Sequence, residues 1–116
     1  MVQSQVAQSE AKLRAARALL LTTLDEAWDR ARRAEELTLD HKMSIRLAST
    51  YAVHQAKEVT SVAYQEAGAT AIFESNPFER RFRDAHSVSQ QVQARTTHFE
   101  TVGQHLLGLP ANLRFV

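Results

Sequence analysis

The strongest local signal in the sequence is a helix start at residues 76–79, which read Asn-Pro-Phe-Glu. Asn76 can cap a helix, because its side-chain oxygen can accept an N–H group that has no partner in the first turn. Pro77 suits the first helical position, where a missing N–H costs nothing. Apolar residues then recur at spacings of three and four around Phe82. The stretch predicts an amphipathic helix with Phe82 in the core and Arg81 outside.

Helical patterns cover most of the chain, and few residues interrupt them. The 116 residues include only three glycines and two prolines, too few to punctuate many short strands. Gly68 is expected to end one helix, and Thr38 and Thr97 are expected to cap others. We therefore predict one domain over residues 1–116, an all-α, up-down four-helix bundle with short connections. The predicted helices span approximately residues 2–35, 39–67, 77–93 and 97–108.

Charge and composition argue against several classes of protein. The formal net charge is +1, so no strong overall field attracts nucleic acid or an anionic membrane. The chain has no cysteine, which excludes disulfide scaffolds and thiolate metal sites and suits a reducing cytoplasm. No apolar run is long enough to span a bilayer, and no signal peptide precedes the first predicted helix. We therefore expect a cytoplasmic protein that binds neither nucleic acid nor membrane.

The first predicted helix carries an apolar stripe that is wider than one small bundle needs. The expected core positions are Val6, Leu13, Ala16, Leu20, Leu24 and Ala27, and the stripe is widened by Leu19, Leu21 and Trp28. A helix with so wide a stripe usually packs against more than one neighbour. Exposed apolar surface of this size normally marks an interface. We therefore expect a homodimer or a homotetramer.

None of the five histidines completes a recognisable metal site. His98 and His105 lie two turns apart, roughly 10 Å along a helix, so they cannot hold one ion together. No carboxylate at a suitable spacing completes a site. His41 and His54 are expected to be solvated, and His86 is expected to have a surface or interface role. We therefore predict no metal site.

Three ordered motifs resemble a known family. They are residues 68–73 (Gly-Ala-Thr-Ala-Ile-Phe), 76–80 (Asn-Pro-Phe-Glu-Arg) and 82–85 (Phe-Arg-Asp-Ala). In this order they resemble the C-terminal helical-bundle domain of the acyl-CoA dehydrogenase superfamily, and more closely its flavin-dependent monooxygenase-like branch. The resemblance covers nearly the whole chain. It implies the last domain of a flavoprotein oxidoreductase, whose N-terminal helical domain and middle β domain lie outside this sequence.

The resemblance implies that this chain completes a flavin site made mostly by other domains. Gln65, Gly68 and Ala69 match positions that approach the FAD or FMN of a neighbouring subunit. They are expected to bind cofactor only together with the missing domains. Ala69 stands where the family has a second glycine, and its side chain hinders a close approach of backbone to phosphate. No cofactor is expected for this chain alone.

The family's catalytic positions hold side chains that cannot transfer protons. Val92 stands at the position of the dehydrogenase base, and Gln91 stands near a histidine of the hydroxylase-like branch. We therefore predict no catalytic residue, and the isolated chain is expected to be inactive. Arg83 and Asp84 match an Arg-Asp pair that we expect to be structural and partly buried. In the family context, His86 could lie beside a ligand.

Three functions stay open, in decreasing order of preference. The first is an oligomerisation and flavin-site-completing domain of an acyl-CoA dehydrogenase-like flavoprotein. The second is a stand-alone helical protein–protein interaction module that kept the fold and lost the chemistry. The third is an enzyme with its own site in the bundle core. It is the least favoured, because no cluster of His, Asp and Glu faces one interior.

Overall fold

The computed structural model describes residues 2–68 and 77–114, and these residues form helices and their connections. The elements are α1 (Val2–Arg32), α2 (Leu39–Ala67), α3 (Pro77–Val88), a 3-10 turn η2 (Val92–Ala94) and α4 (Thr97–Leu106). No strand occurs within the two described ranges. The predicted all-α fold with four helices is confirmed.

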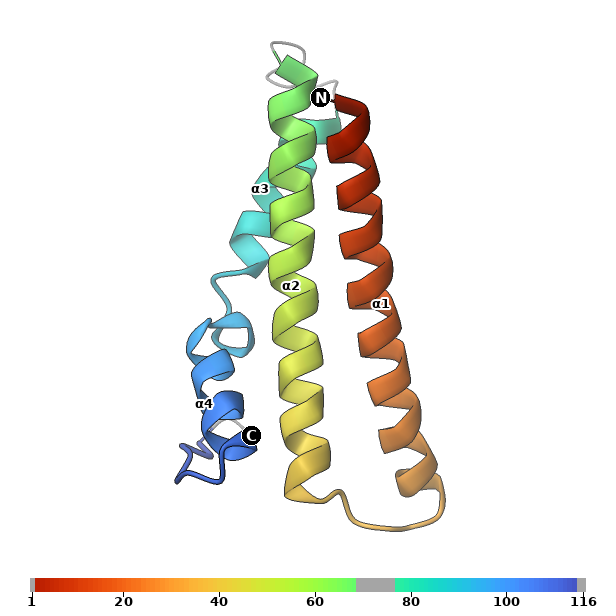
Figure 1. The fold of residues 1–116 in the computed structure, drawn as a ribbon, viewed down its shortest axis with the longest axis vertical. Coiled ribbons are helices and arrows are strands. Elements are labelled where there is room, and N and C mark those ends of the chain that lie inside the picture. The colour runs from red at the N-terminus through yellow and green to blue at the C-terminus, as the bar shows by residue number, and fades with distance from the viewer. Residues whose placement is uncertain (1, 69–76, 115–116) are drawn as a thin grey trace.

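α2 is the central helix, and the other elements pack along its sides (Figure 1). α1 runs antiparallel to α2 along one side. On the other side, α3, η2 and α4 follow one another along α2. The rings of Tyr64 and Phe82 stack near the C-terminal end of α2, and His105 of α4 bonds to Asp40 near its N-terminal end. α4 therefore continues in the direction of α3, and the molecule is elongated, with extents of 50 × 26 × 26 Å.

The core is thin and made largely of small side chains. Its buried apolar residues are Ala16, Met43, Ala48, Ala94 and Val102. Met43 and Thr50 are the largest side chains that are fully buried. Small residues on α2 let the neighbouring helices approach closely, as the many alanines of this helix predict.

The face of α1 that packs on α2 differs from the predicted stripe. Ala16 and Thr23 are buried there, and the half-buried Leu20 and Ala27 continue the face at spacings of three and four. An ion pair between Lys12 and Glu58 crosses the same seam. Val6 and Trp28, which the sequence placed in the stripe, are 63% and 70% exposed. A narrow and partly polar seam therefore joins the two helices, and much of the predicted stripe is left uncovered.

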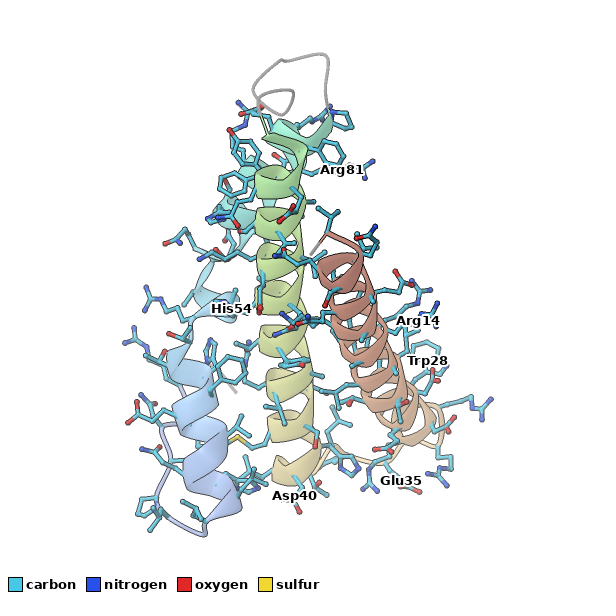
Figure 2. All side chains as sticks on the ribbon, turned by 45° about the horizontal axis from the view of Figure 1, so that its top comes forward. Arg14, Trp28, Glu35, Asp40, His54 and Arg81 are labelled. Atoms are coloured by element: carbon cyan, nitrogen blue, oxygen red, sulfur yellow. The ribbon has the colours of Figure 1, made fainter. Side chains whose placement is uncertain are left out.

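Five exposed apolar residues lie on one face of α1, which we call the α1 flank, and the exposed Glu10 and Arg17 fall in the same sector. Its members are Val6, Leu13, Leu21, Leu24 and Trp28, all exposed. At 3.6 residues per turn, they fall within about 80° of one another around the helix axis. Trp28 lies on the outer side of α1 (Figure 2). Val6 and Leu13 border α2 at one edge of the flank, and within the described residues all five side chains stay at least 40% exposed.

α1 ends at Arg32, and not near residue 35 as predicted, because the backbone is left-handed at Ala34 (φ 56°). The N–H of Glu35 reaches the carbonyl of Arg30, and the N–H of Ala34 reaches the carbonyl of Ala31. Together these bonds form a Schellman ending, in which the left-handed position is usually a glycine. An alanine gives no sequence signal for this conformation.

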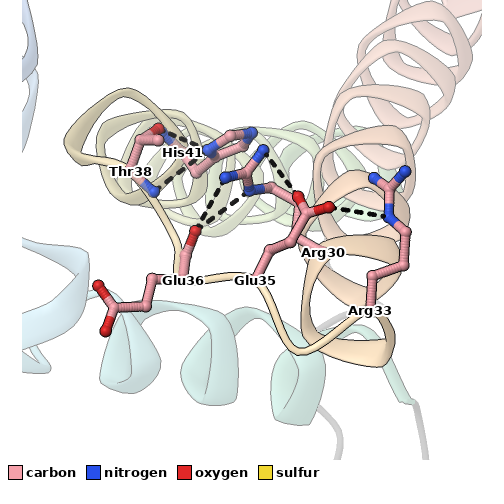
Figure 3. Close-up of polar contacts among 6 residues, drawn as sticks. All are labelled: Arg30, Arg33, Glu35, Glu36, Thr38 and His41. Carbon is pink, nitrogen blue, oxygen red and sulfur yellow. Dashed lines mark hydrogen bonds and ion pairs between the residues drawn. The ribbon is translucent and has the colours of Figure 1, made fainter.

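Polar side chains fix the connection between α1 and α2 (Figure 3). The Arg30 guanidinium donates two bonds of 3.0 and 3.2 Å to the carbonyl of Glu36 and lies 3.3 Å from the Glu35 carboxylate. Thr38 caps α2 as predicted, and its hydroxyl accepts the N–H of His41. In return, Nδ1 of His41 accepts the N–H of Thr38 at 3.3 Å. His41 is partly buried in this capping box, so the expectation that it is solvated is wrong.

α3 ends at Val88, five residues before the predicted boundary. The Ser89 hydroxyl donates to the carbonyl of His86 at 2.7 Å, and such a bond competes with the helix backbone. The N–H groups of Gln90 and Gln91 then bond three residues back instead of four. The helix tightens and stops, and η2 follows as a separate turn.

The start of α4 also differs from the prediction. Thr96 occupies the N-cap position, and its side chain makes no capping bond. Thr97 is already helical, so the predicted cap at Thr97 is wrong. The last helical residue is Leu106, close to the predicted end near residue 108, and Gly108 follows with φ 73°.

α3 packs on α2 through an aromatic stack. The Phe82 ring lies 4.6 Å from the ring of Tyr64 and 4.2 Å from the ring of His86. Phe82 is half-buried, and α3 has no fully buried residue. The predicted orientation of Phe82 therefore holds, but less of its surface is covered than a core position implies.

Ala34→Gly should stabilise the protein, because glycine adopts a positive φ without the steric cost that alanine bears. The expected gain in unfolding free energy is about 0.5–1 kcal/mol, after the greater flexibility of glycine in the unfolded chain is subtracted. Ala31→Gly, inside the last turn of α1, is the matched control and should lose about 1 kcal/mol. Urea unfolding measures both variants, and equal losses would contradict the left-handed conformation.

Phe82→Ala should destabilise the protein by about 2–3 kcal/mol, below the 3–5 kcal/mol typical of a fully buried phenylalanine. The loss combines half-buried surface with two ring contacts. Arg81→Ala, on the exposed face of α3, should change the free energy by less than about 0.5 kcal/mol. Thermal unfolding of both variants tests the orientation of α3, and equal melting temperatures would reject it.

Candidate functional site

A polar pocket lies where α2, the end of α3 and the start of α4 meet. Its volume is about 400 Å³. We call it the cationic pocket, and its walls include His54, Lys57, Ser89, Arg95, Thr96 and Thr97. Gln90 borders this pocket and also a neighbouring one beside the aromatic stack. Three elements far apart in the sequence therefore build one site.

Two histidines hold the chain that forms the wall of the cationic pocket. Nε2 of His54 donates to the carbonyl of Ala94 at 2.6 Å, because a carbonyl can only accept. Nε2 of His98 donates to the carbonyl of Val92, also at 2.6 Å. These bonds fix η2 against α2 and α4, and His54 points from α2 toward this turn (Figure 2). His54 is half-buried, so the expectation that it is solvated is wrong.

The electrostatic character of the pocket is positive. Lys57 and Arg95 line it, and no carboxylate is among its lining residues. Within the described ranges, neither cation's side chain makes an ion pair or a hydrogen bond. The N-terminus of α4 adds the partial positive charge of its backbone N–H groups, since Thr96 gives no side-chain cap. A site with these properties suits an anion such as a phosphate or a carboxylate.

A second, more open pocket lies over the aromatic stack. Its volume is about 480 Å³, and its walls include Tyr64, Phe82, His86, Glu79 and Arg83. Its two charged side chains lie 3.9 Å apart and partly neutralise each other. This open pocket therefore presents an aromatic surface with little net charge.

His86 has a packing role between α2 and α3. Its ring stacks on Phe82, and its Nε2 lies 3.1 Å from the Ser61 hydroxyl. That hydroxyl already donates to the carbonyl of Lys57, so the imidazole must be the donor. The side chain is half-buried at this contact between helices and also borders the open pocket, which is consistent with the expected interface role.

Arg83 and Asp84 do not form the partly buried pair that we expected. Asp84 is exposed and lies 3.8 Å from Arg80, and Arg83 lies 3.9 Å from Glu79. Adjacent residues on a helix point in directions about 100° apart, so the side chains of Arg83 and Asp84 point away from each other. Both contacts are exposed pairs of neighbouring turns and add little stability.

The predicted cofactor residues lie at the C-terminal end of α2. Gln65 is exposed, and its carbonyl accepts the N–H of Gly68. Gly68 has φ 61°, a backbone conformation that favours glycine. The space around it is open, since a Cβ there would meet nothing within 4 Å. Ala69 and Asn76 lie outside the described residues. Gln65 is eight residues beyond Lys57, about 12 Å along the helix, so the structure does not bring these residues together with the cationic pocket.

The two family catalytic positions flank the start of η2. Gln91 is exposed, and Val92 is half-buried with its carbonyl bound by His98.

In the described part of the chain, no group of three or more His, Cys, Asp or Glu residues could hold a metal ion. His105 bonds to Asp40, whereas His98 bonds to the carbonyl of Val92. No helix of residues 2–68 or 77–114 is long and apolar enough to cross a membrane.

Sequence comparison places the chain among flavoprotein domains. The family described as "Acyl-CoA dehydrogenase, C-terminal domain" matches residues 1–96. Two proteins named indole-3-acetate monooxygenase, from Pseudomonas putida and Acinetobacter baumannii, are each 31% identical over 93% and 92% of the chain. A pigment production hydroxylase of Rhodococcus erythropolis is 32% identical over 71% of the chain. The chain covers 28% of each monooxygenase and 21% of the hydroxylase.

Two solved structures share the fold along nearly the whole chain. The 3-HSA hydroxylase from Rhodococcus sp. RHA1 matches 96% of the chain with a TM-score of 0.87 at 20% identity. The HsaA monooxygenase from M. tuberculosis matches 97% with a TM-score of 0.88 at 19% identity. The chain covers 29% and 30% of these proteins. The family match and the relatives above 30% identity show that the chain belongs to the acyl-CoA dehydrogenase superfamily, as a C-terminal helical domain of its flavin monooxygenase-like branch.

Proposed function

We propose that this chain is the oligomerisation and flavin-site-completing domain of an acyl-CoA dehydrogenase-like flavin monooxygenase. The cationic pocket is the observation that carries the flavin part of the proposal. FAD and FMN both carry phosphate, and Lys57 and Arg95 line the pocket without a carboxylate to neutralise them. Cations of this kind form strong, charge-assisted hydrogen bonds to phosphate oxygens.

Gln65 and Gly68 are proposed to make a separate contact with flavin. They lie at the exposed end of α2, where Gly68 presents backbone without a side chain. By family resemblance they and Ala69 serve the cofactor of a neighbouring subunit. One chain would then contribute to two flavins, which couples cofactor binding to assembly.

The proposed domain contributes binding and assembly, and the chemistry belongs to a complete protein. The side chains of Gln91 and Val92 cannot act as a general acid or base near neutral pH. The monooxygenase relatives are more than three times as long as this chain, which covers 28% of each. We therefore assign monooxygenation to a protein that also holds the other family domains, and the isolated chain is proposed to be inactive.

The α1 flank supports self-association. Five exposed apolar side chains share one face of a helix of 31 residues, and Trp28 alone is 70% exposed. Exposed apolar side chains that cluster on one face in this way often mark an interface. We propose a homodimer or homotetramer that covers this flank.

A stand-alone interaction module is the second candidate function, and the α1 flank favours it equally. Both candidates bind a protein through the flank, but only the first makes phosphate-dependent contacts with flavin at the cationic pocket. Flavin titration therefore separates them. The proposed location is the cytoplasm, and neither nucleic acid nor membrane is a proposed partner.

FMN should bind weakly at the cationic pocket of the isolated chain. We expect a colourless purified protein and, on FMN titration, amide NMR shifts at Lys57, Arg95 and Thr97. The dissociation constant should be on the order of 1 mM or weaker, about −4 kcal/mol, because the other domains are absent. Riboflavin, which lacks the phosphate, should shift none of these amides.

Paired variants sharpen the flavin test. Lys57→Gln combined with Arg95→Gln should abolish the FMN-induced shifts, and Arg81→Gln, outside the pocket, should leave them unchanged. Equal responses to FMN and riboflavin would contradict phosphate recognition. Micromolar flavin binding would contradict the need for further domains.

Light scattering at tens of micromolar should give a mass of at least twice 13.0 kDa. Trp28→Glu and Leu24→Glu should shift the protein toward the monomer, because each places a charge in the proposed interface. Ala15→Glu, exposed on another face of α1, is the control and should leave the mass unchanged. A mass of 13.0 kDa for the unmodified chain would reject self-association.

A further inference from the structure

An apolar groove lies between the first turns of α1 and the last turns of α2. Its volume is about 200 Å³. The floor is formed by Val6, Leu13, Val59, Val62 and Ala63. Val6 is 63% exposed, so the described chain leaves the groove open on the side of the α1 flank. A ligand for this groove must bring apolar side chains.

The rim of the groove is acidic. Glu10 and Glu66 line it, and no lysine or arginine does. The Glu10 carboxylate forms an ion pair with Arg14, with 3.0 Å between Oε1 and Nε. Glu66 has no ion pair within the described ranges. The groove therefore favours an apolar segment that carries a positive charge.

The segment after α4 has these properties. Residues 107–114, which we call the leucine tail, read Leu-Gly-Leu-Pro-Ala-Asn-Leu-Arg. Leu107, Leu109 and Leu113 are 76%, 55% and 50% exposed. The tail has one arginine and no acidic side chain, and its proline prevents a regular helix. Its own fold leaves the three leucines largely in solvent.

The leucine tail lies beside the N-terminal end of α2, and the helix turns that line the groove lie at the other end of the molecule (Figure 1). His105, just before the tail, bonds to Asp40 in the first turn of α2. Val62, in the groove, is 22 residues farther along the same helix, about 33 Å away. The tail of the same chain therefore does not cover the groove.

We infer that the leucine tail of a second copy docks in the groove. Two copies that lie antiparallel along their long axes bring each tail beside the groove of the other. A two-fold axis then makes both contacts identical and closes the dimer. The leucines enter an apolar groove, and Arg114 lies near the carboxylates of its rim. This inference rests on the proposed self-association and states which surfaces meet.

Cross-linking tests the contact directly, because the chain has no cysteine of its own. Ser9→Cys marks the groove, and Ala111→Cys marks the tail. The two variants are purified separately, mixed, and treated with a short bismaleimide. We expect a cross-linked species of twice 13.0 kDa in the mixture and little in either variant alone.

Ser4→Cys is the matched control, because it makes the same substitution on another face of α1. It should not cross-link to Ala111→Cys. Adding Leu109→Ser and Leu113→Ser to the tail variant should abolish the cross-link and leave the helical content by circular dichroism unchanged, since both leucines are exposed within one chain. If light scattering shows a dimer but Ser9→Cys cross-links no better than Ser4→Cys, tail docking is wrong and self-association stands. A monomer would overturn both.

Discussion

The packing of α2 against every other element is the constraint on which the structure depends. From Met43 to Tyr64, only Ser44 and Glu58 are exposed. Within the described ranges, no other pair of helices shares an extended contact. Small residues such as Ala48 permit this, because a helix surrounded on several sides must let its neighbours approach closely. Substitutions on α2 therefore act on both sides of the fold.

The early end of α3 creates the most distinctive surface of the molecule. Where the Ser89 hydroxyl bonds to the carbonyl of His86, α3 ends, and the chain continues along α2 through η2, which His54 holds, to α4. The space beneath it, over His54 and Lys57, is the cationic pocket. A regular helix through residue 93, as the apolar spacing predicted, would place its own side chains along this part of α2. The Ser89 bond therefore lies where α3 ends and the cationic pocket begins.

The sequence predicted the fold well and the site poorly, for physical reasons. Periodicity, Thr38 and Gly108 marked helices and two of their boundaries, because these signals are local. The sequence does not indicate the positive φ of Ala34, because the hydrogen bonds around this residue determine its conformation. Lys57 and Arg95 are separated by 38 residues with no fixed spacing between them, so only the fold shows that they share a pocket. Gln65 and Gly68 were identified through family resemblance. Their contact with flavin stays a proposal.

The partly polar seam between α1 and α2 has a consequence for how the chain opens. α1 packs chiefly on one helix, through Ala16, Thr23 and a few half-buried residues, whereas α2 is held from both sides. Regions with few buried apolar contacts open at lower free energy than the global unfolding. Amide hydrogens of α1 should therefore exchange with solvent deuterium well before those of α2. A partner that covers Trp28 would slow that exchange along the whole of α1, so solvent protection of this helix reports on assembly.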